Sequence, residues 1–293
     1  CGATGAETVT FTATDDCGNT STTTATFTIE DTTDPVIATQ ATDQTVECDG
    51  AGNSAAFAAW LSNNGGATAG TEVCGTATWS HNSAGLSDLC GATGAETVTF
   101  TLTDECGNTS TTTATFTIED DTAPALTASS ADLTVECDGS GTTTDLNTWL
   151  NNNGGATATE ACGTITRTNN FTALSDLCGA TGAATVTFTA TDECGNASTS
   201  TATFTIEDTT SPTALGNDIT VILDGNGQAT ITAADIDAGS SDGCGDITMS
   251  LDITSFDCDD VGPNDVVLTV TDECMNAASS TVTVIVTAVD DAA

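Results

Sequence analysis

Carboxylates gather at three points of the sequence, each where a threonine-rich run ends. Calcium takes six to eight oxygen ligands at about 2.3–2.6 Å, and carboxylates supply them. We therefore expect calcium sites here, formed by each acidic run and by acidic loops of the segment that follows. The predicted ligands are Glu30, Asp31, Asp34, Glu72 and Asp104 at the first point, Glu119, Asp120, Asp121, Glu160 and Asp192 at the second, and Asp208 and Asp272 at the third, with Glu207, Asp242, Asn108, Asn196 and Asn276 as neighbours.

The same residues have a second interpretation. Asp and Asn in short turns bond to their own backbone as Asx turns, with glycines such as Gly107 and Gly195 at positive φ, and acidic ends are solvated without an ion. The position of Asp34 becomes Ala123 and Ser211 later in the chain, and no complete EF-hand loop is present. Calcium sites and plain Asx turns therefore both stay open.

The charge balance excludes several classes of function. The chain has one Lys or Arg, which is Arg167, against 42 Asp and Glu, for a formal net charge of −41. Nucleic acids and anionic membranes are excluded as electrostatic partners because both need clustered basic residues. Tyrosine is absent and His81 is the only histidine, so the usual proton-transfer side chains are missing. We expect no catalytic site and no enzyme.

The residues that could do chemistry are carried on an internal repeat. The segment that begins at Cys1 returns nearly unchanged at Cys90 and Cys178, and prolines mark the same period of about 88 residues. The predicted domains are the C-terminal part of a truncated repeat (1–33), two full repeats (34–122 and 123–210) and a divergent repeat (211–293). Because the chain begins in mid-domain, we expect it to be an excerpt from a longer array.

Each period suits one small β-sandwich. Residues 97–105 alternate apolar and threonine side chains, as does the run that ends at Ile118, so both are predicted antiparallel strands. Residues 132–137, 162–168 and 228–236 are predicted as further strands. The spacing of Leu146, Trp149 and Leu150 predicts a short helix. The expected fold class is all-β, a tandem array of small immunoglobulin-like sandwiches.

The Thr-Asp-Glu-Cys-Gly-Asn turn, followed by the Thr-rich run, an acidic stretch and a proline, resembles the HYR-like and immunoglobulin-like repeats of giant Bacteroidota surface adhesins, including gliding-motility adhesins. The resemblance covers essentially the whole chain. It implies a secreted, filamentous role at the cell surface, and it carries no ligand-contacting residue over to this sequence.

Cysteine use indicates an oxidising compartment. There are 13 cysteines, no Cys-x-x-Cys pair and one histidine, which argues for disulfides and against zinc. The four cysteines of a full repeat allow three pairings. In a sandwich the ends of the strands favour pairing within each repeat. The predicted bonds are Cys74–Cys106, Cys48–Cys90, Cys162–Cys194, Cys137–Cys178 and Cys244–Cys274, with Cys1, Cys17 and Cys258 unpaired.

Each linker also carries an Asp-Thr-small motif similar to an O-glycosylation site described for Bacteroidota, which predicts glycans on Thr32, Thr122 and Thr209. The lone His81 is expected at the surface, and Trp79 to be partly exposed.

We expect a structural stalk of an extracellular filament or adhesin. Its partners are neighbouring repeats of the same long chain, and in addition other filament subunits or surface glycans, without membrane insertion. The alternative is a module whose repeats themselves bind a glycan, ice or another surface.

Overall fold

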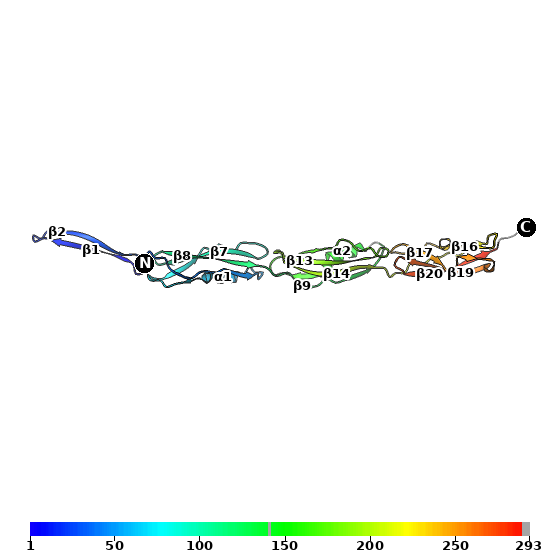
Figure 1. The fold of residues 1–293 in the computed structure, drawn as a ribbon, viewed down its shortest axis with the longest axis horizontal. Helices are drawn as coiled ribbons and strands as arrows, with labels where there is room; N and C mark the ends of the chain where they lie inside the picture. The colour runs from blue at the N-terminus through cyan, green and yellow to red at the C-terminus, as the bar shows by residue number, and fades with distance from the viewer. Residues whose placement is uncertain (140–141, 289–293) are drawn as a thin grey trace. The chain divides into compact units, whose positions relative to one another are not determined.

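The computed structural model describes residues 1–139 and 142–288, so the last five residues of the predicted repeat 211–293 lie outside the described residues. The chain divides into two compact units. Unit 1 consists of Cys1–Ala125, Thr159–Thr166 and Thr191–Ala197, and unit 2 consists of Leu126–Ala158, Arg167–Ala190 and Ser198–Ala293. The fold is all-β apart from short helices, as predicted, and it is built from immunoglobulin-like sandwiches (Figure 1).

Unit 1 begins with a hairpin and continues into a full repeat. In the hairpin, β1 (Gly5–Thr14) pairs antiparallel with β2 (Thr20–Ile29) as a two-stranded sheet. The repeat contains β3 (Ile37–Thr39), β4 (Gln44–Glu47), α1 (Ser54–Ser62), η1 (Asn64–Gly66), β5 (Thr68–Ala69), β6 (Ala77–His81), β7 (Gly94–Asp104) and β8 (Thr109–Glu119). Its main sheet has the order β4-β8-β7-β6, and β3 pairs with β5 in a second, small sheet.

The core of this repeat lies between the main sheet and α1. Alternate residues of β7 point inward, and Phe100 on β7 and Phe116 on β8 are fully buried. Trp60 of α1 lies over both rings, at centroid distances of 5.3 Å and 5.5 Å. After α1 the chain turns sharply at Gly65, whose φ of 63° suits glycine and whose Cβ, if present, would meet the Phe100 ring. The alternate burial of side chains along β7 confirms the period of two predicted for 97–105.

Unit 2 contains the body of the next repeat. Its elements are β9 (Ala125–Ala128), β10 (Leu133–Glu136), α2 (Thr143–Asn151), η2 (Asn153–Gly155), β11 (Thr157–Thr159), β12 (Thr166–Asn169), β13 (Gly182–Thr191) and β14 (Ala197–Glu207). Five end residues of these strands belong to unit 1, namely Ala125, Thr159, Thr166, Thr191 and Ala197. The main sheet repeats the earlier order as β10-β14-β13-β12. The predicted helix is confirmed as α2, which buries Leu146 and Trp149. The predicted strand 132–137 is confirmed as β10, whereas 162–168 forms a strand only from Thr166.

The last repeat keeps this plan with different residues. It contains β15 (Ile219–Ile222), β16 (Ala229–Thr230), α3 (Ala233–Ile236), β17 (Ile247–Leu251), β18 (Ser255–Phe256), η3 (Cys258–Asp260), β19 (Gly262–Asp272) and β20 (Ala277–Thr287). The prediction of a strand over 228–236 is wrong for most of these residues, since only Ala229–Thr230 form a strand and Ala233–Ile236 form a helix. A capping box between Thr232 and Asp235 starts α3 instead, in which Asp235 Oδ2 accepts from the N–H and the hydroxyl of Thr232 at 2.7 Å each.

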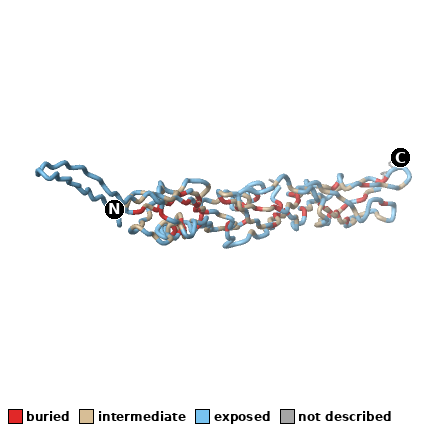
Figure 2. Tube along the Cα trace, turned by 60° about the vertical axis from the view of Figure 1, so that its left-hand side comes forward, coloured by how far each residue is buried: buried red, intermediate tan, exposed pale blue. Residues whose placement is uncertain are grey.

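Burial follows the sheets. The inward faces of the main sheets are buried in each full repeat, while every residue of β1 and β2 is exposed (Figure 2). Among residues 1–139 and 142–288, no helix has the length and apolar character needed to cross a membrane.

Candidate functional site at the joints between repeats

Disulfide bonds link successive repeats, and we call each such junction a joint. The first joint follows Ile29, the second follows Ile118 and the third follows Ile206. The bonds are Cys1–Cys106 at the first joint, Cys48–Cys162 and Cys90–Cys194 at the second, and Cys137–Cys244 and Cys178–Cys274 at the third, with Cα–Cα distances of 5.0–6.1 Å. All five predicted pairings within repeats are therefore wrong.

The reason lies in which ends meet. The cysteines lie at the ends of the sandwiches, as predicted. The predicted pairs, such as Cys74 with Cys106, join two cysteines at the same end of one repeat. At the joint, the end of one repeat faces the opposite end of the next, and the facing cysteines come within bonding distance.

Three cysteines are free in the described parts of the chain, namely Cys17, Cys74 and Cys258. The predictions for Cys17 and Cys258 are confirmed. The prediction that Cys1 is unpaired is wrong, since it bonds to Cys106, and Cys74 is free although it was expected in a disulfide. Cys74 occupies in its repeat the position of Cys162 and Cys244, which bond to the cysteines that follow β4 and β10, Cys48 and Cys137.

A hydrogen bond between a glycine and a glutamate lies beside one disulfide at the first joint and one at the second. At the second joint the N–H of Gly91 donates to Glu193 Oε2 at 3.0 Å, next to the Cys90–Cys194 bond. Gly91 has a φ of 58°, and a Cβ there would overlap the carbonyl of Cys162. Gly2 and Glu105 repeat this contact at the first joint, at 3.1 Å. These residues are not among the predicted site residues, although the Cys-Gly and Glu-Cys pairs recur with the repeat.

This contact predicts a specific sensitivity to a single methyl group. Gly91→Ala places a Cβ against the Cys162 carbonyl and strains the backbone at positive φ, so we expect unfolding to become easier by about 1–3 kcal/mol. Gly5→Ala is the matched control, because a Cβ there meets nothing within 4 Å. Thermal unfolding of the oxidised variants measures the difference, and equal melting temperatures would contradict the role given to Gly91.

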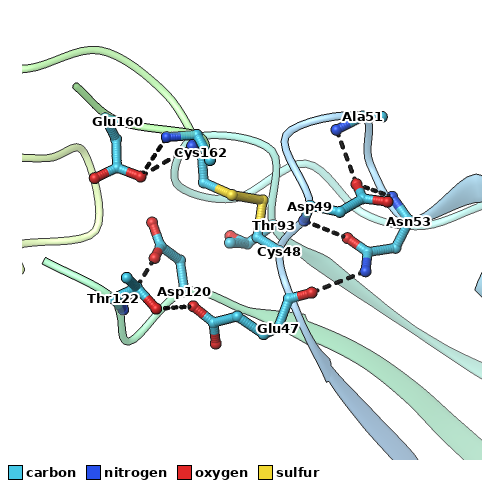
Figure 3. Close-up of a disulfide and its surroundings, with 12 residues drawn as sticks. Glu47, Cys48, Asp49, Ala51, Asn53, Thr93, Asp120, Thr122, Glu160 and Cys162 are labelled. Carbon is cyan, nitrogen blue, oxygen red and sulfur yellow. Dashed lines mark hydrogen bonds between the residues drawn. A yellow bond between two sulfur atoms is a disulfide. The ribbon is translucent and has the colours of Figure 1, made fainter. Parts of the chain in front are cut away.

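Carboxyl groups lie beside the disulfide at the second joint. Figure 3 shows Asp120, Glu160 and Glu47 around the Cys48–Cys162 bond. One oxygen each of Asp120 and Glu160 and the sulfur of Cys162 lie within 4.8 Å of one another. Glu160 accepts hydrogen bonds from the N–H groups of Ala161 and Cys162. The Oδ2 atom of Asp120 is buried and has no hydrogen-bond partner.

The third joint repeats this arrangement with one exchange. Asp208, Asp242 and Cys244 form the equivalent group, so an aspartate replaces the glutamate. The Oδ2 atom of Asp208 is again buried without a partner, as is that of Asp272, a residue that is 4% exposed. At the first joint Asp31 also has a buried, unpartnered Oδ2.

The linker aspartates are electrostatically unfavourable as anions. Burial raises the pKa of Asp120, and the negative charges of Asp192, Glu160 and Glu47 raise it further. Burial likewise raises the pKa of Asp208, with contributions from Asp242, Asp272 and Glu136. A bound cation would relieve this repulsion at both joints.

The turn aspartates follow the alternative interpretation. Asp104 Oδ1 accepts from the N–H groups of Cys106 and Asn108, which is an Asx turn. Burial raises the pKa of Asp192, but its bonds to Asn196 and the turn backbone outweigh that effect and lower it. Asn196 also donates to the Asp120 carbonyl at 2.9 Å, which ties the turn to the linker. The turns are therefore part of the joint even without an ion.

The structure brings together only part of the predicted ligand set. Asp120 with Glu160 and Asp208 with Asp242 converge. Glu72 bonds to the N–H groups of Val73 and Cys74 at the first joint, outside any such group in the described residues. Four further predicted ligands are exposed and lie in neither group, namely Glu30, Asp34, Glu119 and Asp121.

The chemistry of the two groups suits a hard cation. The sulfurs of Cys162 and Cys244 are in disulfides, so they are not thiolate ligands. Each group thus offers two carboxylates, one of them with an unsatisfied buried oxygen. Calcium accepts carboxylate and water oxygens in a flexible geometry, whereas zinc prefers nitrogen and thiolate sulfur. The residues present fit calcium held in part by water.

The predicted glycosylation sites lie on the exposed face of the linkers. Thr32, Thr122 and Thr209 are all exposed. The hydroxyl of Thr122 donates to Glu47 Oε1 at 2.7 Å, and that of Thr209 donates to Glu136 Oε2 at 3.0 Å. A glycan on either residue would replace a hydrogen bond of the joint. His81 is exposed and Trp79 is partly buried, as expected.

Comparison with known proteins finds similarity among solved structures alone. No protein-family model and no curated protein matches the sequence. Structural neighbours include the protocadherin GammaB4 extracellular domain (TM-score 0.35, 13% identity, 96% of this chain and 54% of that chain), PcdhgB3 EC1-4 (0.33, 12%, 98% and 84%) and the human Desmocollin-1 ectodomain (0.25, 11%, 97% and 68%). The chain spans about half of the first of these. At such TM-scores the similarity indicates no ligand or partner for this chain.

Proposed function

We propose that this chain is a structural stalk of an extracellular filament or cell-surface adhesin, in which covalent joints hold successive repeats. The observation that carries the proposal is the pair of disulfides at the second joint and again at the third. Disulfides persist in oxidising, extracellular compartments. Loops of this length stabilise a fold by about 4–5 kcal/mol on the chain-entropy account. The function is mechanical and its partners are other repeats.

Two features of the linkers extend the proposal. Calcium bound by Asp120 with Glu160, and by Asp208 with Asp242, would neutralise the carboxyl groups at the joints. Glycans on Thr32, Thr122 and Thr209 would cover the linkers. Intact mass of native material, followed by peptide mapping, tests the second feature. We expect hexose on at least one of these residues, and bare threonines at all of them would exclude it.

Small-angle scattering tests the stalk function. We expect the oxidised chain to populate a narrow range of maximum dimensions, since one disulfide restricts the first joint and two restrict each of the others, and the reduced chain to populate a wider one. Identical profiles in the two states would contradict the proposal. Binding of the oxidised chain to a glycan array, lost on substitution of Trp79, would instead favour a module whose repeats contact a ligand themselves.

A further inference from the structure

One carboxylate at the third joint is buried with an unsatisfied oxygen. Asp272, the last residue of β19, is 4% exposed, and its Oδ2 atom has no hydrogen-bond partner among the described residues. Its Oδ1 atom accepts from the N–H of Asn276 at 2.8 Å, which fixes the side chain in the turn. Burying a carboxylate oxygen costs free energy unless a donor or a cation satisfies it, so this oxygen points to a bound partner.

The equivalent aspartate of the second joint has no free oxygen. Asp192 accepts from the N–H of Asn196 at 2.9 Å with one oxygen and from its side-chain amide at 3.0 Å with the other. Asn276 makes the first of these contacts to Asp272, but its side-chain amide donates to the backbone carbonyl of Asp208 at 3.0 Å and leaves Asp272 Oδ2 unpaired. The hydrogen bonding of the turn aspartate is therefore complete at the second joint and incomplete at the third.

Two further carboxylates lie near this one. The Oδ2 atom of Asp208 is also buried without a partner, and one oxygen of Asp208 lies within 4.8 Å of one oxygen of Asp242. Burial raises the pKa of Asp208, and the negative charges of Asp242 and Asp272 raise it further, as neighbouring anions do. Glu136 is already engaged, because it accepts from the N–H and the hydroxyl of Thr209. Three aspartates thus share the third joint without a cationic side chain.

This arrangement suits a calcium ion better than that of the second joint does. Two oxygens bound to one calcium ion at about 2.3–2.6 Å are at most about 5 Å apart, and Asp208 and Asp242 already have this spacing. An ion there would satisfy the buried oxygens of Asp208 and Asp272 together. At the second joint (Figure 3) it would satisfy only that of Asp120 among the described residues. Calcium affinity depends on the number of charged ligands, so the third joint should be the stronger site.

We propose that Asp208, Asp242 and Asp272 together bind one calcium ion, and that this site fills at a lower calcium concentration than the site at the second joint. The proposal rests on the calcium sites of the proposed function, to which it adds Asp272 as a ligand and an order of filling. As the calcium concentration rises, the carboxylates of the third joint are neutralised first and those of the second joint follow. The two joints therefore respond to different ranges of calcium concentration.

Calorimetric titration of the oxidised full chain with calcium chloride tests the order of filling. We expect two classes of site whose dissociation constants differ by at least about tenfold. Asp272→Asn keeps the Oδ1 acceptor of the turn but removes the charge, so it should weaken the tighter class at least about tenfold and leave the weaker class unchanged. Asp192→Asn is the matched control, because both oxygens of Asp192 are hydrogen-bonded, and it should change either affinity by less than about threefold.

The outcomes separate this proposal from the proposed function. Equal effects of Asp272→Asn and Asp192→Asn, or a single class of sites that Asp272→Asn leaves unchanged, would overturn the role of Asp272 and leave calcium at the joints in place. A wild type that binds no calcium would overturn both, whereas the stalk function is tested by scattering of the oxidised and reduced chains in chelator. Melting temperatures in chelator show whether each variant folds. If Asp272→Asn melts below the wild type there, Asp242→Asn tests the same site from another loop and should weaken the tighter class equally.

Discussion

Pulled from its two ends in the oxidised state, the chain should lengthen far less than its residue count allows. The shortest covalent path from Cys1 to Cys274 uses three disulfides and crosses only Cys90–Cys106 and Cys178–Cys194. These stretches contain about 30 residues, roughly 100 Å when extended, against about 270 residues and roughly 900 Å after reduction. Single-molecule force spectroscopy with and without reductant measures both lengths.

One double substitution tests the path itself. Removing the Cys90–Cys194 bond with Cys90→Ser and Cys194→Ser makes the route through Cys137–Cys244 the shortest path, with the backbone stretches Cys106–Cys137 and Cys244–Cys274, and should add about 30 residues, roughly 100 Å, to the oxidised length. Removing Cys48–Cys162 instead should add nothing, because that bond is off the shortest path. Full extension of the oxidised wild type to about 900 Å would show that the bonds do not cross the joints.

The second large effect concerns the ionisation of Asp120. Its pKa is raised in the folded state, so its contribution to stability is present below its unfolded pKa and is lost as pH rises through the folded value. At pH 7 without divalent ions, Asp120→Asn should therefore raise the melting temperature, by about 2–4 °C. The gain should disappear at a pH below about 4, where both forms are neutral.

Calcium should reverse the order of stability of the wild type and Asp120→Asn. The wild type should gain stability with a midpoint of about 0.1–1 mM calcium, the range of weak extracellular sites, while Asp120→Asn should gain less. Asp121→Asn removes the same charge from the adjacent exposed residue and should behave like the wild type. Equal calcium responses of all three proteins would rule out a site at Asp120 and leave the Asx turns as the whole account of the joint.

The sequence was sufficient for the fold because its signals are local. Alternation of apolar and threonine side chains specifies β7 and β8, and the spacing of Leu146, Trp149 and Leu150 specifies α2. The strand predicted for 228–236 failed because a capping box at Thr232 outweighed the alternating pattern. Local patterns therefore predicted β7, β8 and α2, but they failed where a capping box started α3 and predicted only part of the strand that begins at Thr166.

The joints could not be predicted from one repeat. Each cysteine was correctly expected at an end of the sandwich, but its partner depends on which end the next repeat presents, and no single period contains that information. The carboxylates could be predicted as a group of candidate ligands because they recur at each linker. Which of them converge depends on loop conformation, so Asp120 with Glu160 could not be distinguished from exposed neighbours such as Asp121.

The order of the disulfides along the chain has a consequence for proteolysis. The five loops overlap in succession, from Cys1–Cys106 to Cys178–Cys274, so at least one disulfide spans every peptide bond between Cys1 and Cys274. A protease that cuts any single bond in this range leaves the two fragments joined in one covalent molecule. Damage that would sever an ordinary string of domains therefore leaves this one connected, and even two cuts between Cys1 and Cys274 leave its ends joined until the disulfides are reduced.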